Sequence, residues 1–130
     1  MKKVASFFAG IGGICYGFKQ AGFEVCYANE FDKNACKSYR ANHPDANLVE
    51  GDIRQIEPDS IPDFDVFAGG FPCQPYSMAG KKEGLADVRG TLFFDIVRIL
   101  KAKRPDSFLL ENVKNIQSTH EGKDFKVIVL

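Results

Sequence analysis

The segment Asp65-Val66-Phe67-Ala68-Gly69-Gly70-Phe71-Pro72-Cys73-Gln74-Pro75-Tyr76-Ser77 joins an apolar run to a rigid turn. Its first four residues predict a short buried strand, which the two glycines end. Pro72 and Pro75 fix their own φ angles and push the residues before them out of the helical region. We therefore expect Cys73 on a stiff, extended turn at the carboxyl end of a strand, where ligands bind in open α/β sheets.

The position of Cys73 favours a reactive thiol over a packing residue. An inert buried thiol is the commoner role of a cysteine, but packing does not require a mount flanked by prolines. A nucleophilic thiol must lose its proton, and either a helix N-terminus or a positively charged neighbour favours that loss. The sequence predicts a nucleophile here and leaves open which of the two activates it.

Length and composition indicate one domain without an overall electrostatic bias. The chain has 130 residues, and Lys plus Arg equals Asp plus Glu at 17 each. Phosphate binding normally leaves a basic excess, so a nucleic-acid interface would have to be local or lie elsewhere. The remaining cysteines, Cys15, Cys26 and Cys36, form no C-x-x-C pair. That spacing argues against zinc and against a disulfide framework, and predicts small buried residues in a reducing cytosol.

The N-terminus resembles a signal peptide only in outline. Lys2-Lys3 precedes an apolar run over residues 4–18, but four glycines interrupt that run and no small-x-small cleavage site follows. No stretch is long enough to span a membrane. The sequence predicts a soluble, cytoplasmic protein that has no membrane partner.

Five short apolar runs predict strands, at residues 4–8, 23–28, 46–49, 65–68 and 107–110. Helices are expected at 14–21, 33–42 and 91–103, with Gly22 after the first, Asp32 capping the second and His43-Pro44 ending it. The third is predicted to be amphipathic. Its apolar residues Leu92, Ile96, Ile99 and Leu100 share one face, and its charged residues Asp95, Arg98 and Lys101 lie off that face. Residues 52–62 are interpreted as a polar connection broken by prolines, and residues 77–89 as a long mobile loop.

Strands that alternate with helices predict an α/β fold with a doubly wound, mainly parallel sheet. Each predicted strand ends in a chemically distinctive residue or turn, and in a parallel sheet all of these strand ends lie at the same edge. They are the glycine turn, Glu30, Asp52, Cys73 and Glu111.

The first three strand ends suggest a nucleoside site. The turn Phe8-x-Gly10-x-Gly12-Gly13, followed by Glu30 after the second strand, is similar to a dinucleotide fingerprint in which an acidic residue binds ribose hydroxyls. The departure from G-x-G-x-x-G disfavours a pyrophosphate and suits a nucleoside without phosphates. Asp52 could accept a hydrogen bond from an adenine amino group, or could serve only as a turn or cap residue.

Glu111 and the two histidines complete the list of candidates. Glu111 directly follows an apolar strand and is either a solvated strand end or, if partly buried, a carboxyl of raised pKa that can donate a proton. His43 and His120 stand in polar, turn-like contexts and are expected to be surface residues.

Six motifs in order resemble those of the DNA (cytosine-5)-methyltransferases, and they cover nearly the whole chain. They are Phe8-Ala9-Gly10-Ile11-Gly12-Gly13, Asn29-Glu30-Phe31-Asp32, Gly51-Asp52-Ile53, Gly70-Phe71-Pro72-Cys73-Gln74, Arg89-Gly90-Thr91-Leu92-Phe93-Phe94 and Glu111-Asn112-Val113. The resemblance implies the Rossmann-like fold of S-adenosylmethionine-dependent methyltransferases. The Ser77-Met78-Ala79-Gly80 segment looks more like the DNA enzymes than like tRNA cytosine-5 methyltransferases, which share the same pocket.

The resemblance also implies a role for each site residue. S-adenosylmethionine, which becomes S-adenosylhomocysteine, would be bound by Phe8, Gly10, Ile11, Gly12, Gly13, Glu30, Phe31, Asp52, Ile53 and Leu92. A cytosine flipped out of double-stranded DNA would be surrounded by Pro72, Gln74, Ser77, Asn112 and Val113. Cys73 would attack C6 of the base, Glu111 would hold its N3 and N4 edge and protonate N3, and C5 would take the methyl group. No metal is implied.

The family continues beyond the motifs present here. Its further parts are an arginine-bearing motif, two strands, a target-recognition domain and a C-terminal helix. Residues 1–130 are therefore expected to be the N-terminal part of the catalytic domain, without the target-recognition domain. The alternative interpretation is an inactive S-adenosylmethionine-binding module or one subunit of a split enzyme that needs a C-terminal partner.

Overall fold

The computed structural model describes residues 1–71 and 92–111. Within them, five strands form one sheet: β1 (Lys3–Phe7), β2 (Glu24–Glu30), β3 (Leu48–Glu50), β4 (Val66–Gly69) and β5 (Ser107–Leu110). Their order is β3-β2-β1-β4-β5, and all four neighbouring pairs are parallel. The predicted parallel α/β sheet is confirmed, and its strand ends do share one edge.

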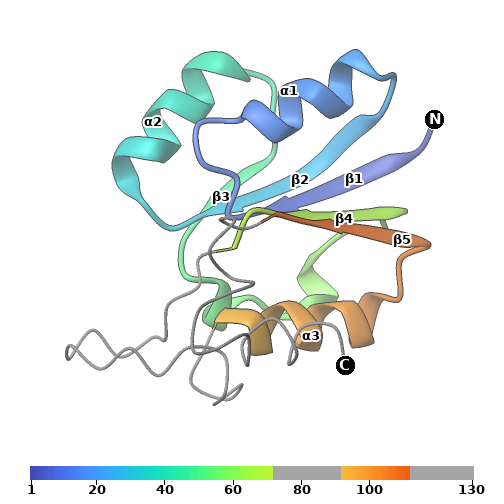
Figure 1. The fold of residues 1–130 in the computed structure, drawn as a ribbon. Helices are drawn as coiled ribbons and strands as arrows, with labels where there is room; N and C mark the ends of the chain where they lie inside the picture. Colours follow the sequence, from blue (N-terminus) through green and yellow to red (C-terminus); the bar gives the residue numbers. More distant parts are fainter. Residues whose placement is uncertain (72–91, 112–130) are drawn as a thin grey trace, which may run out of the picture.

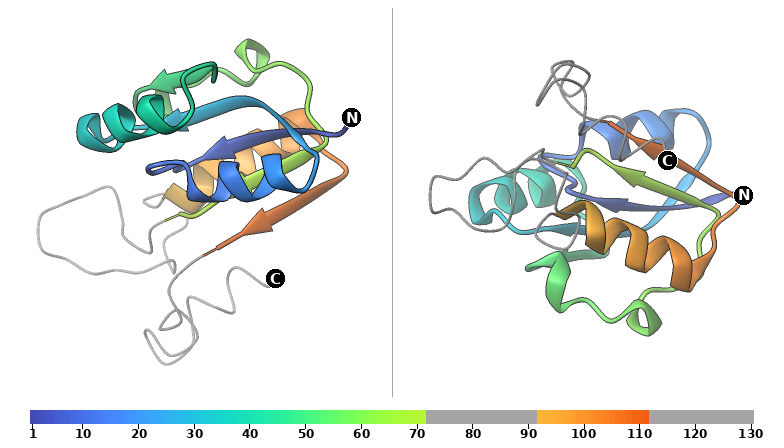
Figure 2. Two further views of the ribbon diagram at one scale, coloured as in Figure 1. Left: turned by 90° about the horizontal axis from the view of Figure 1, so that it is seen from above. Right: turned by 60° about the horizontal axis from the view of Figure 1, so that its bottom comes forward.

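Helices cover both faces of the sheet, as expected for a doubly wound fold (Figure 1). Helices α1 (Gly13–Gln20) and α2 (Lys33–Asn42) lie on one face. On the other face lie α3 (Leu92–Lys103) and two short 3-10 helices, η1 (Ile53–Gln55) and η2 (Pro58–Ser60), which Figure 2 shows in front of the sheet in its right-hand view. The strand order reverses between β1 and β4, which makes their carboxyl ends the topological switch point.

Local signals explain where the helices begin and end. The Asp32 carboxylate accepts a hydrogen bond from the Ala35 N–H at 2.8 Å and caps α2. His43 follows α2, and Pro44 cannot continue the helix. Gly22 lies in the left-handed region, at φ 91°, just after α1. The predicted bounds were correct to within two residues, and those of β5 were correct at both ends.

The core is divided by the sheet into a large aromatic half and a small half. On the α3 face, Phe7 stacks on Phe67 with ring centroids 4.6 Å apart, and twelve buried residues form one cluster. On the α1–α2 face, the cluster is built of small or slender residues around Tyr39, and includes Cys15 and Ala28. Both faces of the central strands are covered, and residues 4–7 of β1 are accordingly all buried, Ser6 among them.

The connection from β3 to β4 is more than a polar linker. Its isoleucines Ile53, Ile56 and Ile61 are buried in the aromatic cluster, and Phe64 joins them. The interpretation of residues 52–62 as a polar connection was therefore wrong. Most of these residues are polar, but the isoleucines among them pack under α3. One further expectation also needs correction: Cys26 is only partly buried, whereas Cys15 and Cys36 are buried as predicted.

Among the described residues, the structure has no helix that is long and apolar enough to cross a membrane. Within the same residues, no three His, Cys, Asp or Glu side chains gather as metal ligands would.

Candidate functional site

The glycine turn between β1 and α1 has an open side and a closed side. Gly10 and Gly12 have φ values of 60° and 99°, a region that glycine adopts without the strain of a Cβ. A Cβ placed on Gly10 would meet nothing within 4 Å, whereas one on Gly12 would lie 2.4 Å from His43 Nε2. Free space at this turn therefore lies on the Gly10 side.

The closed side of the turn is held by Asn42, the last residue of α2, and by His43, which follows it. His43 Nε2 lies 2.9 Å from the Gly12 carbonyl oxygen, and His43 Nδ1 lies 2.8 Å from Lys19 Nζ. Because a carbonyl only accepts, Nε2 carries the hydrogen and Nδ1 accepts from the lysine. Asn42 donates to the Ile11 carbonyl at 2.9 Å. His43 is 5% exposed, so the expected surface histidine is in fact a buried support of the turn.

Glu30 closes the end of β2 onto the same turn. Its Oε1 accepts from the Gly10 N–H at 2.8 Å, and its Oε2 accepts from the N–H groups of Phe31 and Asp32 at 2.9 and 2.8 Å. A carboxylate offers about four acceptor positions, so one remains for a ligand. Glu30 thus fixes the turn and keeps a free acceptor beside it.

Two large apolar side chains stand uncovered after β1 and β2. Ile11 is 59% exposed and Phe31 is 68% exposed. Each follows the carboxyl end of one of two neighbouring strands, β1 and β2, which pair as far as Phe7 and Asn29. By contrast, Ile53 is buried in the core, and Leu92 packs against that core while partly buried.

Asp52 lies after β3 and caps η1. Its Oδ1 accepts from the Arg54 N–H at 2.9 Å, and the Arg54 guanidinium binds both carboxylate oxygens. Hydrogen bonding to the Arg54 side chain lowers the pKa of Asp52, so this carboxylate is ionised at neutral pH. The Arg54 side chain itself is 48% exposed and is held at the surface.

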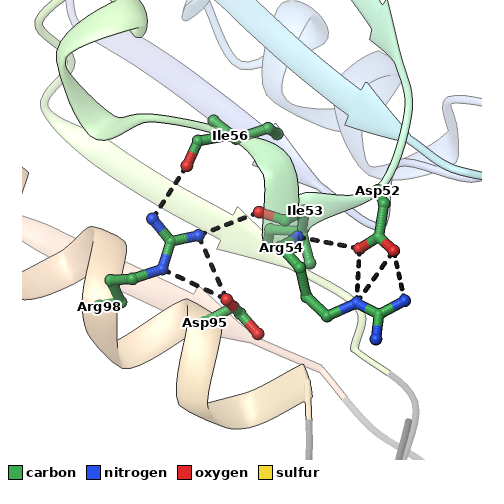
Figure 3. Close-up of polar contacts among 6 residues, drawn as sticks. All are labelled: Asp52, Ile53, Arg54, Ile56, Asp95 and Arg98. Atoms are coloured by element: carbon green, nitrogen blue, oxygen red, sulfur yellow. Dashed lines mark hydrogen bonds and ion pairs between the residues drawn. The ribbon is translucent and has the colours of Figure 1, made fainter.

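A partly buried ion pair on α3, between Arg98 and Asp95, contacts this segment (Figure 3). Arg98 Nη1 donates to the Ile56 carbonyl at 2.9 Å, and Nη2 donates to the Ile53 carbonyl at 3.0 Å. Nε and Nη2 also donate to Asp95 Oδ1, both at 3.2 Å. Asp95 is 5% exposed, and burial raises its pKa while Arg98 opposes that rise. The expectation that Asp95 lies away from the buried face was wrong.

Glu111 lies beside the switch point, directly after β5, which pairs with β4. Its N–H donates to the Gly69 carbonyl at 2.9 Å, which continues the pairing of β5 with β4. A Cβ on Gly70 would lie 3.0 Å from Glu111 Oε2 and 4.0 Å from the Phe8 carbonyl oxygen. The Glu111 carboxylate is thus brought beside Gly70 and the start of the glycine turn. Glu111 is exposed, as a solvated strand end would be.

The other predicted site residues lie outside the described part of the chain. They are Pro72, Cys73, Gln74, Ser77, Asn112 and Val113, together with the predicted mobile loop and His120.

Sequence reasoning missed four residues that shape the site: Asn42, Arg54, Asp95 and Arg98. The only available signal for the last two was their i, i+3 spacing between buried isoleucines on α3.

Comparison with known families agrees with this geometry. The model of the family described as C-5 cytosine-specific DNA methylase matches residues 2–130. The chain belongs to this family.

Curated relatives of this methylase chain are type II methyltransferases. M.NlaX of Neisseria lactamica is 52% identical over 131 residues, a match that spans 99% of this chain and 42% of the relative. M1.ScrFI of Lactococcus lactis subsp. cremoris is 51% identical over 98% of this chain and 32% of the relative. The chain therefore spans less than half the length of these relatives.

A solved structure gives the same fold for the methylase chain. A mutant of Spodoptera frugiperda DNMT2 superposes with a TM-score of 0.75 at 30% identity, over 92% of this chain and 38% of the other. The doubly wound, Rossmann-like sheet is therefore the sheet of a C5 methyltransferase. In this chain, the glycine turn, Glu30, Asp52 and Glu111 all lie at the carboxyl edge of the sheet.

Proposed function

We propose that this chain is the N-terminal catalytic part of a DNA (cytosine-5)-methyltransferase of the restriction-modification type, which uses S-adenosylmethionine. One observation carries the proposal: Glu111 and the Glu30-fastened glycine turn flank the switch point of a sheet whose chain belongs to the methylase family. A carboxylate and an open nucleoside-sized turn at one crevice suit a reaction between a base and a nucleoside cofactor.

The residues around the turn fit S-adenosylmethionine. Glu30 retains an acceptor for ribose hydroxyls, and the uncovered side chains of Ile11 and Phe31 offer apolar contact to a purine. Asp52 is an ionised acceptor for the adenine amino group. The amino group would replace contacts between Asp52 and the half-exposed side chain of Arg54, and losing an ion pair at the surface costs little free energy. The remaining cofactor residues of the proposal are Phe8, Gly10, Gly12, Gly13, Ile53 and Leu92.

The chemistry we propose uses Cys73 and Glu111. The Cys73 thiolate bonds to C6 of a cytosine flipped from the duplex, and Glu111 donates a proton to N3 as negative charge develops there. The resulting electron-rich C5 is the nucleophile; bound S-adenosylmethionine supplies the electrophilic methyl group and is released as S-adenosylhomocysteine. Loss of the C5 proton to a base then expels the Cys73 thiolate and restores the C5–C6 double bond. Pro72, Gln74, Ser77, Asn112 and Val113 surround the flipped base.

Recognition of the DNA sequence is proposed to require more than these residues. The chain spans 42% of the Neisseria lactamica relative and 32% of the Lactococcus lactis relative. We assign target recognition to a C-terminal portion or a second subunit, which also fits the absence of net charge here. The substrate is cytosine in double-stranded DNA, and the place of action is the cytoplasm.

The cofactor assignment is tested by calorimetric titration of the chain with S-adenosylhomocysteine. We expect saturable binding that weakens at least tenfold, roughly 1.4 kcal/mol, in Glu30→Ala, because the variant loses both the ribose acceptor and the fastening of the turn. Glu24→Ala is the matched control, since Glu24 is an exposed glutamate at the opposite end of the same strand. Failure of the wild-type chain to bind, or equal binding by Glu30→Ala, would contradict the assignment.

A further inference from the structure

We propose that Asp95 and Arg98 of α3 are positioning residues that set the selectivity of the cofactor site for a 6-aminopurine. The inference rests on the proposed function, because it concerns how Asp52 meets the adenine. Neither residue touches the cofactor in this proposal. Both act through the main chain of η1, which carries Asp52 at its N-terminus (Figure 3).

The first step is the contact between Arg98 and η1. The carbonyls of Ile53 and Ile56 lie at the two ends of η1, and the two terminal nitrogens of Arg98 bind one each, at 3.0 and 2.9 Å. A guanidinium is planar and rigid, so two contacts at a fixed separation define the orientation of the short helix as well as its place. These partners are 45 and 42 residues away in sequence.

The second step is the orientation of Arg98 itself. Asp95 Oδ1 accepts from Nε and Nη2, so the carboxylate fixes the plane of the guanidinium. Asp95 is buried, and its burial raises its pKa while the charge of Arg98 opposes that rise. The two residues therefore work as one unit, since removing Arg98 would leave a buried carboxylate without its counter-charge.

The third step runs from η1 to Asp52. The Arg54 N–H, inside η1, donates to Asp52 Oδ1 at 2.9 Å, so turning η1 turns the carboxylate. Apolar packing holds α3 against the core, through Phe93, Ile96 and Ile99, and it also buries Ile53 and Ile56. Such packing is not directional, so it does not by itself fix the orientation of η1. Burying Asp95 with part of Arg98 costs desolvation that apolar side chains of similar size would avoid, and the donors of Arg98 bind the main chain of η1, beside Asp52.

The test is a ratio of two affinities, which a loss of stability alone does not change. S-adenosylhomocysteine and S-inosylhomocysteine differ at the 6-position of the purine, where the second has an oxygen in place of the amino group. A site built to accept a hydrogen bond from that amino group rejects the oxo analogue strongly. For the wild-type chain we expect S-adenosylhomocysteine to bind at least tenfold more tightly, roughly 1.4 kcal/mol.

The variants are Arg98→Met, Arg98→Lys and Asp95→Asn, with Arg104→Met as the matched control. We expect the ratio to fall about fivefold or more in Arg98→Met, chiefly through weaker binding of S-adenosylhomocysteine. Arg98→Lys should recover only part of it, because an ammonium is a point charge and cannot bridge two carbonyls in a fixed plane. Asp95→Asn is nearly isosteric and keeps an acceptor, so it serves if Arg98→Met fails to fold. Arg104 follows α3 with an exposed side chain, and its substitution should leave the ratio unchanged.

Different results overturn different claims. If the wild-type chain binds S-adenosylhomocysteine and the ratio is the same in Arg98→Met and Asp95→Asn, the positioning role is wrong and the cofactor assignment stands. If the wild-type chain binds neither ligand, the cofactor assignment fails and this inference fails with it. If both affinities fall equally in the variants, Arg98 has a structural role only and the proposal is wrong.

Discussion

Gly12 and His43 show how one residue of the turn depends on a side chain that follows another helix, α2. The imidazole of His43 occupies the space where any other residue at position 12 would place its Cβ. At the same time, its Nε2–H satisfies the Gly12 carbonyl. Glycine is therefore required at position 12 for two reasons, the left-handed φ of 99° and the close approach of the ring.

Gly12→Ala is expected to lower the free energy of unfolding by about 2–3 kcal/mol, through backbone strain and overpacking. In a His43→Ala background the steric part disappears, so the cost of the second substitution should fall by about 1 kcal/mol. Urea unfolding of the four proteins of the cycle measures this coupling. Gly13→Ala is the control, because a Cβ there meets nothing within 4 Å. Equal costs for the two alanines would contradict the role of His43.

Arg54 makes a pH-dependent contribution through Asp52. The folded pKa of Asp52 lies below its ordinary value of 3.8, so the pair stabilises the fold above that pH and the benefit is lost as pH falls through the folded pKa. Arg54→Met should therefore cost about 0.5–1 kcal/mol at pH 7, a figure limited by the exposure of Arg54, and less near pH 2, where protonation of Asp52 weakens the pair. Thermal unfolding at the two pH values measures the difference. A cost independent of pH would be evidence against the ion pair.

At the scale of elements, the connection from β3 to β4 determines how α3 meets the sheet. The two 3-10 helices place Ile53, Ile56 and Ile61 under α3, while Arg98 donates to the carbonyls of Ile53 and Ile56 at the two ends of η1. The Lys103 side chain likewise donates to the Ile61 carbonyl at 2.7 Å. Apolar packing and polar contacts thus both join α3 to the connection from β3 to β4. Asp52 lies at the start of that connection, so its position is fixed by the same contacts.

Ile61→Ala is expected to destabilise the chain by about 2–4 kcal/mol, because it leaves a cavity in the aromatic cluster. Ile61 is 2% exposed, whereas Val49 on β3 is 36% exposed, so Val49→Ala should cost less than about 1 kcal/mol. Urea denaturation of both variants provides the comparison. A cost for Ile61→Ala as small as that for Val49→Ala would mean that the connection is the polar linker first expected.

At the scale of the whole molecule, the sheet gathers the chemistry at one edge. The order β3-β2-β1-β4-β5 places Asp52, Glu30, the glycine turn and Glu111 along that edge, and puts the switch point between the turn and Glu111. A nucleoside on the β1–β2–β3 side and a base near Glu111 would meet at that switch point. The separation of a nucleoside side from a base side follows from the strand order and not from any single motif.

Methyl transfer by the completed enzyme is expected to depend on Cys73. The chain would be combined with the C-terminal remainder of the Neisseria lactamica relative and offered DNA that contains 5-fluorocytosine, which cannot lose a C5 proton. We expect a covalent protein–DNA adduct that disappears in Cys73→Ser, since a hydroxyl is far less acidic than a thiol, while S-adenosylhomocysteine binding persists. An adduct in Cys73→Ser would show that another residue is the nucleophile. If the completed enzyme methylates tRNA in preference to DNA, it is a tRNA cytosine-5 methyltransferase. If it transfers a methyl group to neither, the chain is an S-adenosylmethionine-binding module without activity.

The sequence by itself determined the elements and the edge on which the site lies. Asp32 and His43-Pro44 bound α2 through contacts with residues close in sequence, and alternating strands and helices imply a parallel sheet whose strand ends coincide. The positions of Glu30, Asp52 and Glu111 followed from that rule. For Glu30, the motif predicted a ligand for ribose hydroxyls, and it gave no sign of the three N–H groups, that of Gly10 among them, that Glu30 binds in the structure.

Only the tertiary structure decided what supports those residues. The buried imidazole of His43 is satisfied by the carbonyl of Gly12, which is 31 residues away in sequence. The buried carboxylate of Asp95 pairs with Arg98, whose other contacts are carbonyls 42 and 45 residues away. No local pattern separates these side chains from solvated ones, since a polar residue becomes buried only where a distant backbone group satisfies it. The strand order was likewise visible only in the tertiary structure, where β1 and β4 pair and bring Phe7 against Phe67 in the aromatic cluster.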